Sequence, residues 1–380
     1  MIESKLPDVG TTIFTRMSGL AAAHGALNLS QGFPDFDAPE PLREAMSRHV
    51  MAGHNQYAPM PGVMHLREQI AAQIALHRGV SCNPDSEITV VPGATEGIFC
   101  AVMASVRPGD EVILLDPCYD SYQPSVELAG GIAVHVPLTA GSFALDRERL
   151  AAALSPRSRL LMINSPHNPS GSTLSKADLL YLEELVERHN LLCISDEVYE
   201  HLVFDGQAHH SVLQFPALRA RSFALFSFGK TFSVTGWKTG YCVAPPALTR
   251  ELRKVHQFVS FVAVTPVQLA LADFMRDEPA YPATLAAFYQ QKRDLFCQAL
   301  ENSRFALAPS AGTYFQLLDY SAISTVADTS LSEQWTRERG IASIPISVFY
   351  QQPPQQFLLR FCFAKSDPVL REAAEILCKI

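Results

Sequence analysis

Two lysines and a serine lie close together just beyond a short apolar run, Phe223 to Phe226. Ser227 stands three positions before Lys230, and Lys238 stands eight positions after it. A lysine whose pKa is lowered by burial or by nearby cations can condense with a carbonyl to give a Schiff base. A hydroxyl and a second cation at this spacing could bind a phosphate. The segment therefore indicates a lysine that holds an aldehyde cofactor, with a solvated glycine-containing loop as the alternative.

The elements that must position these side chains form a repeating pattern from about residue 86 onward. Short β-branched or apolar runs alternate with helix-like stretches, which is typical of β-α units around a mainly parallel sheet. Polar clusters follow five of the expected strands, and open α/β sheets bind ligands at the carboxyl ends of their strands. These clusters should therefore converge on one edge. We expect strands at residues 88–91, 112–115, 133–136, 160–163, 191–194, 223–226 and 241–244.

The converging clusters offer the groups that an aldehyde cofactor with a pyridine ring requires. Asp196 follows an expected strand and can pair with a protonated ring nitrogen, although an acid there could also cap a helix. Its neighbour Glu197 should face the opposite side of the strand. Asn168 and Tyr199 are candidate donors to the ring oxygen. Tyr119 offers an aromatic face for stacking, with ordinary core packing as the alternative.

Two further features of the sequence could bind anionic groups of a ligand. Gly93, Ala94 and Thr95 resemble the start of a helix, where backbone N–H groups can meet a phosphate. Arg360 is a lone cation in an apolar strand, 358–363. A buried guanidinium needs a partner, and the carboxylate of a substrate is a suitable bidentate one. A structural salt bridge to a nearby acid is the alternative for Arg360.

Composition limits the class of protein. With 380 residues, 48% of them hydrophobic, the chain can bury a large core and should form two domains. A net charge of −8 without a basic run argues against nucleic acid or an anionic membrane surface as partners. The eight cysteines form no C-x-x-C pair and fit a reducing cytoplasm, and the start of the chain predicts no secretory signal.

Neither a metal site nor a membrane span is expected. The pair His209-His210 has no ligand spacing around it and reads as a solvated loop. The long apolar segment from Val259 to Met275 contains proline and polar residues, so we expect a core helix there instead of a span.

The C-terminal part reads as a smaller α+β unit, with a boundary or bend near residues 278–282. The N-terminal stretch is too irregular to form a domain and should pack on this unit. The sequence thus predicts a large domain of residues 45–280 and a small domain of residues 1–44 and 281–380. In the small domain we expect helices at 288–300, 331–339 and from 368, and strands at 314–318 and 357–363.

With these residues in place, the chain resembles the class I aminotransferases of the fold type I pyridoxal-phosphate enzymes. Within them it is most similar to the kynurenine/glutamine branch that includes bacterial methionine aminotransferases. The resemblance extends from the segment 29–36 through 55–62 to Arg360, which is nearly the whole chain. It implies an α/β fold of type I, with a mainly parallel sheet in the large domain and a smaller α+β domain.

The resemblance also implies roles for individual residues. Pyridoxal 5'-phosphate would bind covalently to Lys230, with Asp196 on its ring nitrogen and Tyr119 stacked on its ring. Asn168 and Arg360 would bind the substrate carboxylate, Asn168 and Tyr199 the ring oxygen, and the backbone near Gly32 would close over the substrate. The phosphate would be bound by Ala94, Thr95, Ser227 and Lys238, and by Tyr57 from the neighbouring subunit of a homodimer. Cis peptides are implied at Asp116-Pro117 and Asn168-Pro169.

One difference from the aspartate-specific aminotransferases indicates the expected substrate. Aspartate-specific relatives carry arginine where Lys238 stands, and a second arginine from the partner subunit, which we cannot place here. The corresponding segment, 256–261, is apolar and aromatic, and Ile13 and Phe14 could form another wall, which favours an apolar substrate side chain. We predict ping-pong transamination from a large apolar L-amino acid to a 2-oxo acid, with methionine, aromatic amino acids and glutamine as candidate donors.

Two other functions stay open from the residues alone. The same fold could carry a pyridoxal-phosphate-dependent lyase that splits a C–S bond in cystathionine-like substrates, because fold does not determine chemistry. A ligand-sensing module of a DNA-binding regulator is the third reading, but the segment before residue 30 is too short for a winged helix.

Overall fold

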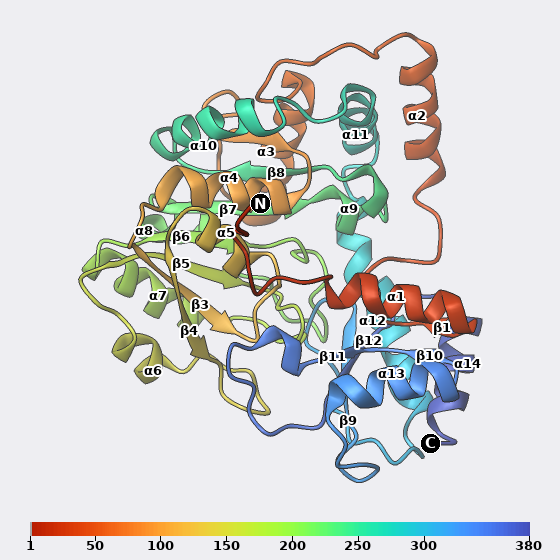
Figure 1. The fold of residues 1–380 in the computed structure, drawn as a ribbon. Helices are drawn as coiled ribbons and strands as arrows, with labels where there is room; N and C mark the ends of the chain where they lie inside the picture. Colours follow the sequence, from red (N-terminus) through yellow and green to blue (C-terminus); the bar gives the residue numbers. More distant parts are fainter. Residues whose placement is uncertain (1) are drawn as a thin grey trace.

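The computed structural model describes residues 2–380, and its centre is a sheet of seven strands (Figure 1). The strand order is β2-β8-β7-β6-β5-β3-β4, and only β8 runs antiparallel to its neighbours. The predicted mainly parallel sheet is confirmed, and each expected strand forms within two residues of its expected ends. The strands are β2 (Ile88–Val91), β3 (Glu111–Asp116), β4 (Ile132–Pro137), β5 (Ser158–Asn164), β6 (Leu192–Asp196), β7 (Ser222–Ser227) and β8 (Gly240–Val243).

Helices cover both faces of this sheet, which is why its central strands are apolar throughout. Alternate side chains of one strand enter different cores: Phe223 and Leu225 of β7 face one side, and Ala224 and Phe226 face the other. One face is covered by α4 (Ala94–Ser105), α5 (Tyr122–Leu128) and α10 (Pro246–Val259). The other is covered by α3 (Met64–Arg78), α6 (Arg147–Ala152), α7 (Lys176–Arg188), α8 (Pro216–Arg219) and α11 (Thr265–Asp277), and α2 (Glu40–Met51) packs against α11.

A second, smaller sheet lies in the C-terminal part, in the antiparallel order β11-β12-β9. As expected, the N-terminal stretch packs there: β1 (Leu27–Asn28) pairs with β10 (Ile341–Ala342), and α1 (Ile13–His24) lies on α13 (Asp328–Glu338), red beside blue in Figure 1. The expected helices and strands of the tail all form. The remaining elements are β9 (Phe315–Asp319), β11 (Ile344–Pro345), β12 (Leu358–Cys362), α12 (Tyr281–Ala299) and α14 (Asp367–Leu377).

The core helix expected within the segment Val259 to Met275 forms as α11, but it begins only at Thr265. Helix α10 ends at Val259, and a break that includes the left-handed residue Phe261 separates it from α11. Pro266 lies in the first turn of α11, where its missing N–H costs nothing, so it starts a new helix instead of continuing the old one. The interruption of the helical pattern expected near 278–282 is present as the break between α11 and α12. Within residues 2–380 no helix has the length and apolar character that a bilayer span requires.

Gly240 begins β8 at a point of close backbone approach. A Cβ at this position would collide with the carbonyl oxygen of Phe226 and lie 3.2 Å from the Ala94 nitrogen, and neither backbone atom can move freely. We expect Gly240→Ala to lower the free energy of unfolding by about 1–3 kcal/mol. Gly236→Ala is the matched control, because its Cβ would meet nothing within 4 Å. Thermal unfolding checks this, and equal midpoints for the two variants would contradict it.

Candidate active site

The polar clusters at the strand ends meet in one cavity of about 520 Å³. The predicted convergence on one edge of the sheet is therefore confirmed, and segments of the small sheet and the N-terminal stretch close the cavity from the other side. All the predicted site residues except Tyr57 line it: Phe14, Gly32, Ala94, Thr95, Tyr119, Asn168, Asp196, Tyr199, Ser227, Lys230, Lys238 and Arg360.

Lys230 lies in α9 (Phe228–Thr231), the short helical turn that follows β7. Its amine donates a hydrogen bond to the carbonyl oxygen of Gly32 at 3.0 Å, and the Tyr314 hydroxyl donates to the same oxygen. Burial, together with smaller effects of the cations Lys238 and Arg360, lowers the pKa of Lys230 to about 8. A lysine with this pKa is more often neutral near pH 7 than an exposed one, so it is a better nucleophile.

Asp196 is the last residue of β6, and its carboxylate faces the cavity. The Tyr122 hydroxyl donates to one carboxylate oxygen at 2.6 Å, and the Val198 N–H donates to the other at 3.3 Å. Burial raises the pKa of Asp196 to about 6. Residues 197–201 form a turn and not a helix, so the helix-cap alternative for Asp196 is wrong.

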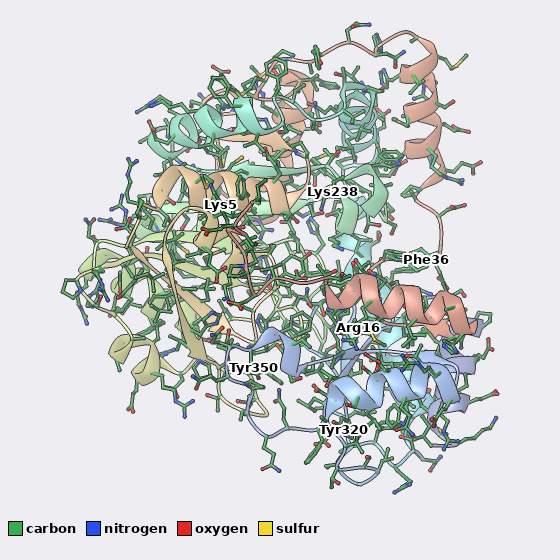
Figure 2. The ribbon with its side chains drawn as sticks, in the orientation of Figure 1. Lys5, Arg16, Phe36, Lys238, Tyr320 and Tyr350 are labelled. Carbon is green, nitrogen blue, oxygen red and sulfur yellow. The ribbon has the colours of Figure 1, made fainter. Side chains whose placement is uncertain are left out.

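A cation, two hydroxyls and a helix N-terminus gather at one end of the cavity. Ala94 and Thr95 begin α4, whose first backbone N–H groups have no partner within the helix. The Lys238 ammonium lies 3.5 Å from the Thr95 hydroxyl, close to α9 (Figure 2), and Ser227 adds a second hydroxyl to the lining. Such a set of donors suits a phosphate.

Arg360 lies in β12 and is fully buried in the wall of the cavity. Its guanidinium donates to the Asn168 side-chain oxygen at 2.6 Å and to the Ser30 carbonyl at 2.9 Å, and it lies 3.8 Å from the centre of the Phe315 ring. In residues 2–380 no carboxylate pairs with it and its Nε–H has no acceptor, so the salt-bridge alternative is wrong. A buried guanidinium without a counter-charge is suited to take a carboxylate from a ligand.

The comparisons with known proteins agree with this geometry. The model of the family "Aminotransferase class I and II" matches residues 25–377. The chain belongs to this family. It is 51% identical to the methionine aminotransferase of Escherichia coli (strain K12), over 99% of this chain and 97% of that protein. It is 41% identical to the probable N-succinyldiaminopimelate aminotransferase DapC of Mycobacterium tuberculosis, over 98% and 97%.

Among solved structures, this aminotransferase is similar to YbdL from Escherichia coli, for which a methionine aminotransferase function was identified. The two chains share 50% identity and a TM-score of 0.98, and the match covers 100% of each. Enzymes of this family depend on pyridoxal 5'-phosphate. The residues that line the cavity fit that cofactor. Lys230 is a buried lysine of lowered pKa, Asp196 is a buried acid in the same cavity, and Thr95 and Lys238 offer donors for the phosphate.

Tyr57 lies outside the cavity of its own chain. Its side chain is 84% exposed and packs edge-on against Phe261 at 5.5 Å between ring centres. The segment 256–261 also lies outside this cavity, and His256 is buried against Glu96 at 2.8 Å. Of the two residues expected to form a second wall, Phe14 lines the cavity and Ile13 does not.

Several features were not expected from the sequence. Tyr122, the first residue of α5, holds Asp196 by a hydrogen bond across 74 positions of the chain, which no local signal marks. Gln31 donates to the Phe14 carbonyl at 3.0 Å and so fixes that wall. The solvated loop expected at His209-His210 is wrong for His209, whose side chain is only 6% exposed because it donates to the buried Glu197. The two expected cis peptides are confirmed, and a third occurs at Ser165-Pro166.

Proposed function

We propose that this aminotransferase transfers the amino group of an L-amino acid with a large apolar side chain, methionine in the first place, to a 2-oxo acid. Arg360 supports this most directly: a buried guanidinium without a counter-charge faces the same cavity as a lysine of lowered pKa. The walls beside it are aromatic, with Phe14 and Tyr119 at 6.3 Å between ring centres. The similarity to the Escherichia coli methionine aminotransferase supports methionine as donor.

Each residue of the cavity has a role in this proposal. Pyridoxal phosphate supplies an electron sink that stabilises negative charge on the substrate Cα. Lys230 would hold the cofactor through its Nζ, and the same amine, when it is free, would act as general base and acid for the proton of the substrate Cα. Asp196 would bind the ring nitrogen and keep it protonated, and Tyr119 would pack on the ring.

The remaining residues orient the two ligands. Arg360 and Asn168 bind the substrate α-carboxylate, and the backbone at Gly32 covers it. Asn168 and Tyr199 would donate to the ring oxygen. The phosphate would be held by Ala94, Thr95, Ser227 and Lys238, where a helix N-terminus and a cation act together.

The visible absorption spectrum tests the proposal. The protein loaded with pyridoxal phosphate should show the band of the lysine-bound cofactor. L-methionine without an acceptor should bleach it to the pyridoxamine form, and a 2-oxo acid should restore it. A stable band that does not respond to methionine would contradict methionine as donor. Release of ammonia and an oxo acid from cystathionine, without any acceptor, would instead show a lyase.

We further propose that the active unit is a homodimer in which Tyr57 reaches the phosphate of the neighbouring site. Tyr57 and Phe261 are exposed together outside the chain's own cavity, as residues that serve a neighbouring subunit would be. In a C2 dimer each subunit then completes the other's site.

Complementation between two inactive variants checks the role of Tyr57. Tyr57→Ala and Lys230→Ala should each have little activity alone. When they are coexpressed, hybrid dimers contain one site with both residues intact, so activity should return to about a quarter of the wild-type value. If Tyr57 served its own chain, the hybrids would stay inactive.

A further inference from the structure

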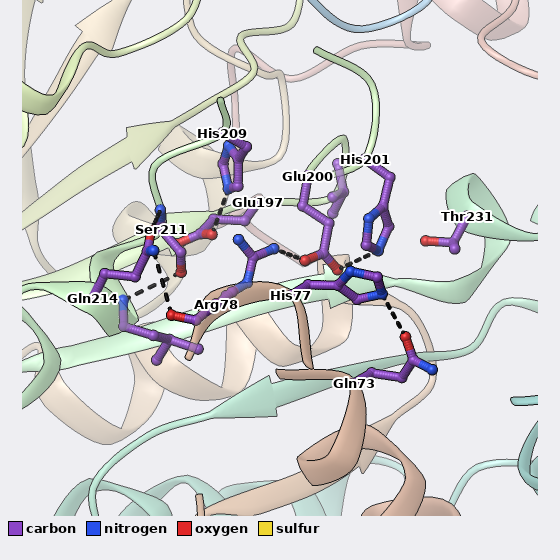
Figure 3. A network of polar contacts seen from close by, with 12 residues as sticks. Gln73, His77, Arg78, Glu197, Glu200, His201, His209, Ser211, Gln214 and Thr231 are labelled. Carbon is purple, nitrogen blue, oxygen red and sulfur yellow. Dashed lines mark hydrogen bonds and ion pairs between the residues drawn. The ribbon is translucent and has the colours of Figure 1, made fainter. Parts of the chain in front are cut away.

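Behind the active site, on the face of β6 that points away from the cavity, lies a buried group of charges. It consists of Arg78, Glu197 and Glu200, which we call the rear cluster (Figure 3). None of the three lines the cavity, and the proposed function assigns them no role. Arg78 and Glu200 form an ion pair whose side chains are only 6% and 7% exposed. Buried charges are costly unless they are paired, so this group needs an explanation.

Glu197 fixes the backbone on both sides of Asp196. Its carboxylate accepts from Ser195 within the strand at 3.1 Å and from His209 at 2.8 Å. It also accepts from the Ser211 hydroxyl and the Val212 N–H, both at 3.1 Å. Because Ser195 and Glu197 are the two neighbours of Asp196, these contacts fix the direction in which the Asp196 side chain leaves the strand.

Arg78 and Glu200 extend the cluster to the next two strands. The Tyr241 hydroxyl of β8 donates to Glu200 at 3.2 Å, and the Tyr241 ring stacks on Phe226 of β7 at 4.7 Å. Arg78 lies 5.8 Å from the centre of the Phe226 ring. Figure 3 shows its guanidinium between the Glu197 and Glu200 side chains. The cluster therefore contacts β6, which ends at Asp196, β7, which leads to Lys230, and β8, which begins just after Lys238.

The histidines around the cluster do not add positive charge. Burial lowers the pKa of His77, His201 and His209. The geometry agrees for His209: its Nδ1 is buried and has no partner in residues 2–380, so a charged ring would leave an N–H unpaired. Burial opposes the ionisation of Glu197, but the hydrogen bond from His209 and the nearby Arg78 hold its pKa below the usual value. Two carboxylates and one guanidinium leave one net negative charge.

We propose that the rear cluster is a positioning unit of the transamination site. It holds the ends of β6, β7 and β8 together, and its net negative charge favours the protonated forms of the Lys230 nitrogen and of the ring nitrogen that Asp196 binds. This inference rests on the proposed function.

Two variants that each remove one charge from the rear cluster test this proposal, because they should shift the pH midpoint of the visible band in opposite directions. Glu197→Gln removes a negative charge, so the midpoint of the pH titration of the holoenzyme's visible band should move to lower pH, by about half a unit. Arg78→Gln removes the positive charge and should move the midpoint to higher pH by a similar amount. Arg78→Lys keeps the charge and Glu187→Gln changes only an exposed acid, so both should stay at the wild-type midpoint.

A second measurement needs no cofactor. In the cofactor-free protein, the pH dependence of Lys230 acylation by acetic anhydride, followed by mass spectrometry, should show the same pair of opposite shifts. Shifts of the same sign, or none, would reduce the cluster to a packing role and overturn the proposal. Failure of the proposed function looks different: the wild-type protein would then show no lysine-bound band, or a band that does not respond to methionine, whatever the acylation result.

Discussion

Lys230→Ala should lower the rate of transamination by at least about four orders of magnitude, because no other group can hold the cofactor covalently or move the Cα proton. Only the Lys230 amine among the lysines lining the cavity lies beside the Gly32 carbonyl, with its pKa lowered to about 8. The variant should still bind pyridoxal phosphate through the donors at the start of α4, but its visible band should match that of free cofactor. Steady-state assays with methionine and a 2-oxo acid check the rate, and the spectrum checks the binding.

A surface lysine provides the control for this prediction. Lys254 is 69% exposed and pairs only with the exposed Glu251, so Lys254→Ala should keep wild-type activity. Sustained multiple turnover by Lys230→Ala would rule out the assigned role of the residue, whatever its effect on the spectrum.

Arg360→Lys should lower kcat/KM for methionine by about a hundredfold, mostly through KM. Lysine keeps the charge but loses the fork that meets a carboxylate with two parallel hydrogen bonds, and it cannot donate to Asn168 and to a substrate with the same geometry. The loss of a hydrogen bond between charged groups, and of its geometry, accounts for the expected size of the effect. Initial rates over a range of methionine concentrations measure it.

A substrate without a carboxylate separates substrate binding from damage to the fold. With 3-methylthiopropylamine, which is methionine without its carboxylate, wild-type protein and Arg360→Lys should react at similar, low rates. An equal loss with both substrates would show that Arg360, which is buried on the Phe315 ring, acts by supporting the structure.

The order of the strands along the chain could be predicted, but the direction of β8 could not. Its residues, Gly240–Val243, are as apolar as those of the parallel strands, because it is buried on both faces as they are. Direction depends on the connection, and the segment 228–239 contains only a four-residue helix and a 3-10 turn, too little for a full crossover. The division into domains at residues 44 and 280 stays a prediction; α2, on which its first boundary falls, packs against α11.

A site residue could be predicted from the sequence where its charge contrasts with the apolar residues next to it. Lys230, Asp196 and Arg360 are charged residues in or just after apolar strands, so the sequence alone marks them. Tyr122 and Gln31 were missed because their roles depend on contacts between elements far apart in the chain. His209 was misjudged for the same reason: nothing near it in the sequence shows that the buried Glu197 is its partner.

The antiparallel pairing of β7 with β8 has a consequence for how the cofactor is retained. Ser227 pairs with Gly240 across the two strands, so the whole segment between them, with both Lys230 and Lys238, is one closed hairpin connection. The proposed anchor for the aldehyde and the proposed cation for the phosphate would thus not be independent attachments. A fluctuation that unzips this hairpin would displace Lys230 and Lys238 together and leave the cofactor to the contacts made by the start of α4 and by the ring-binding residues.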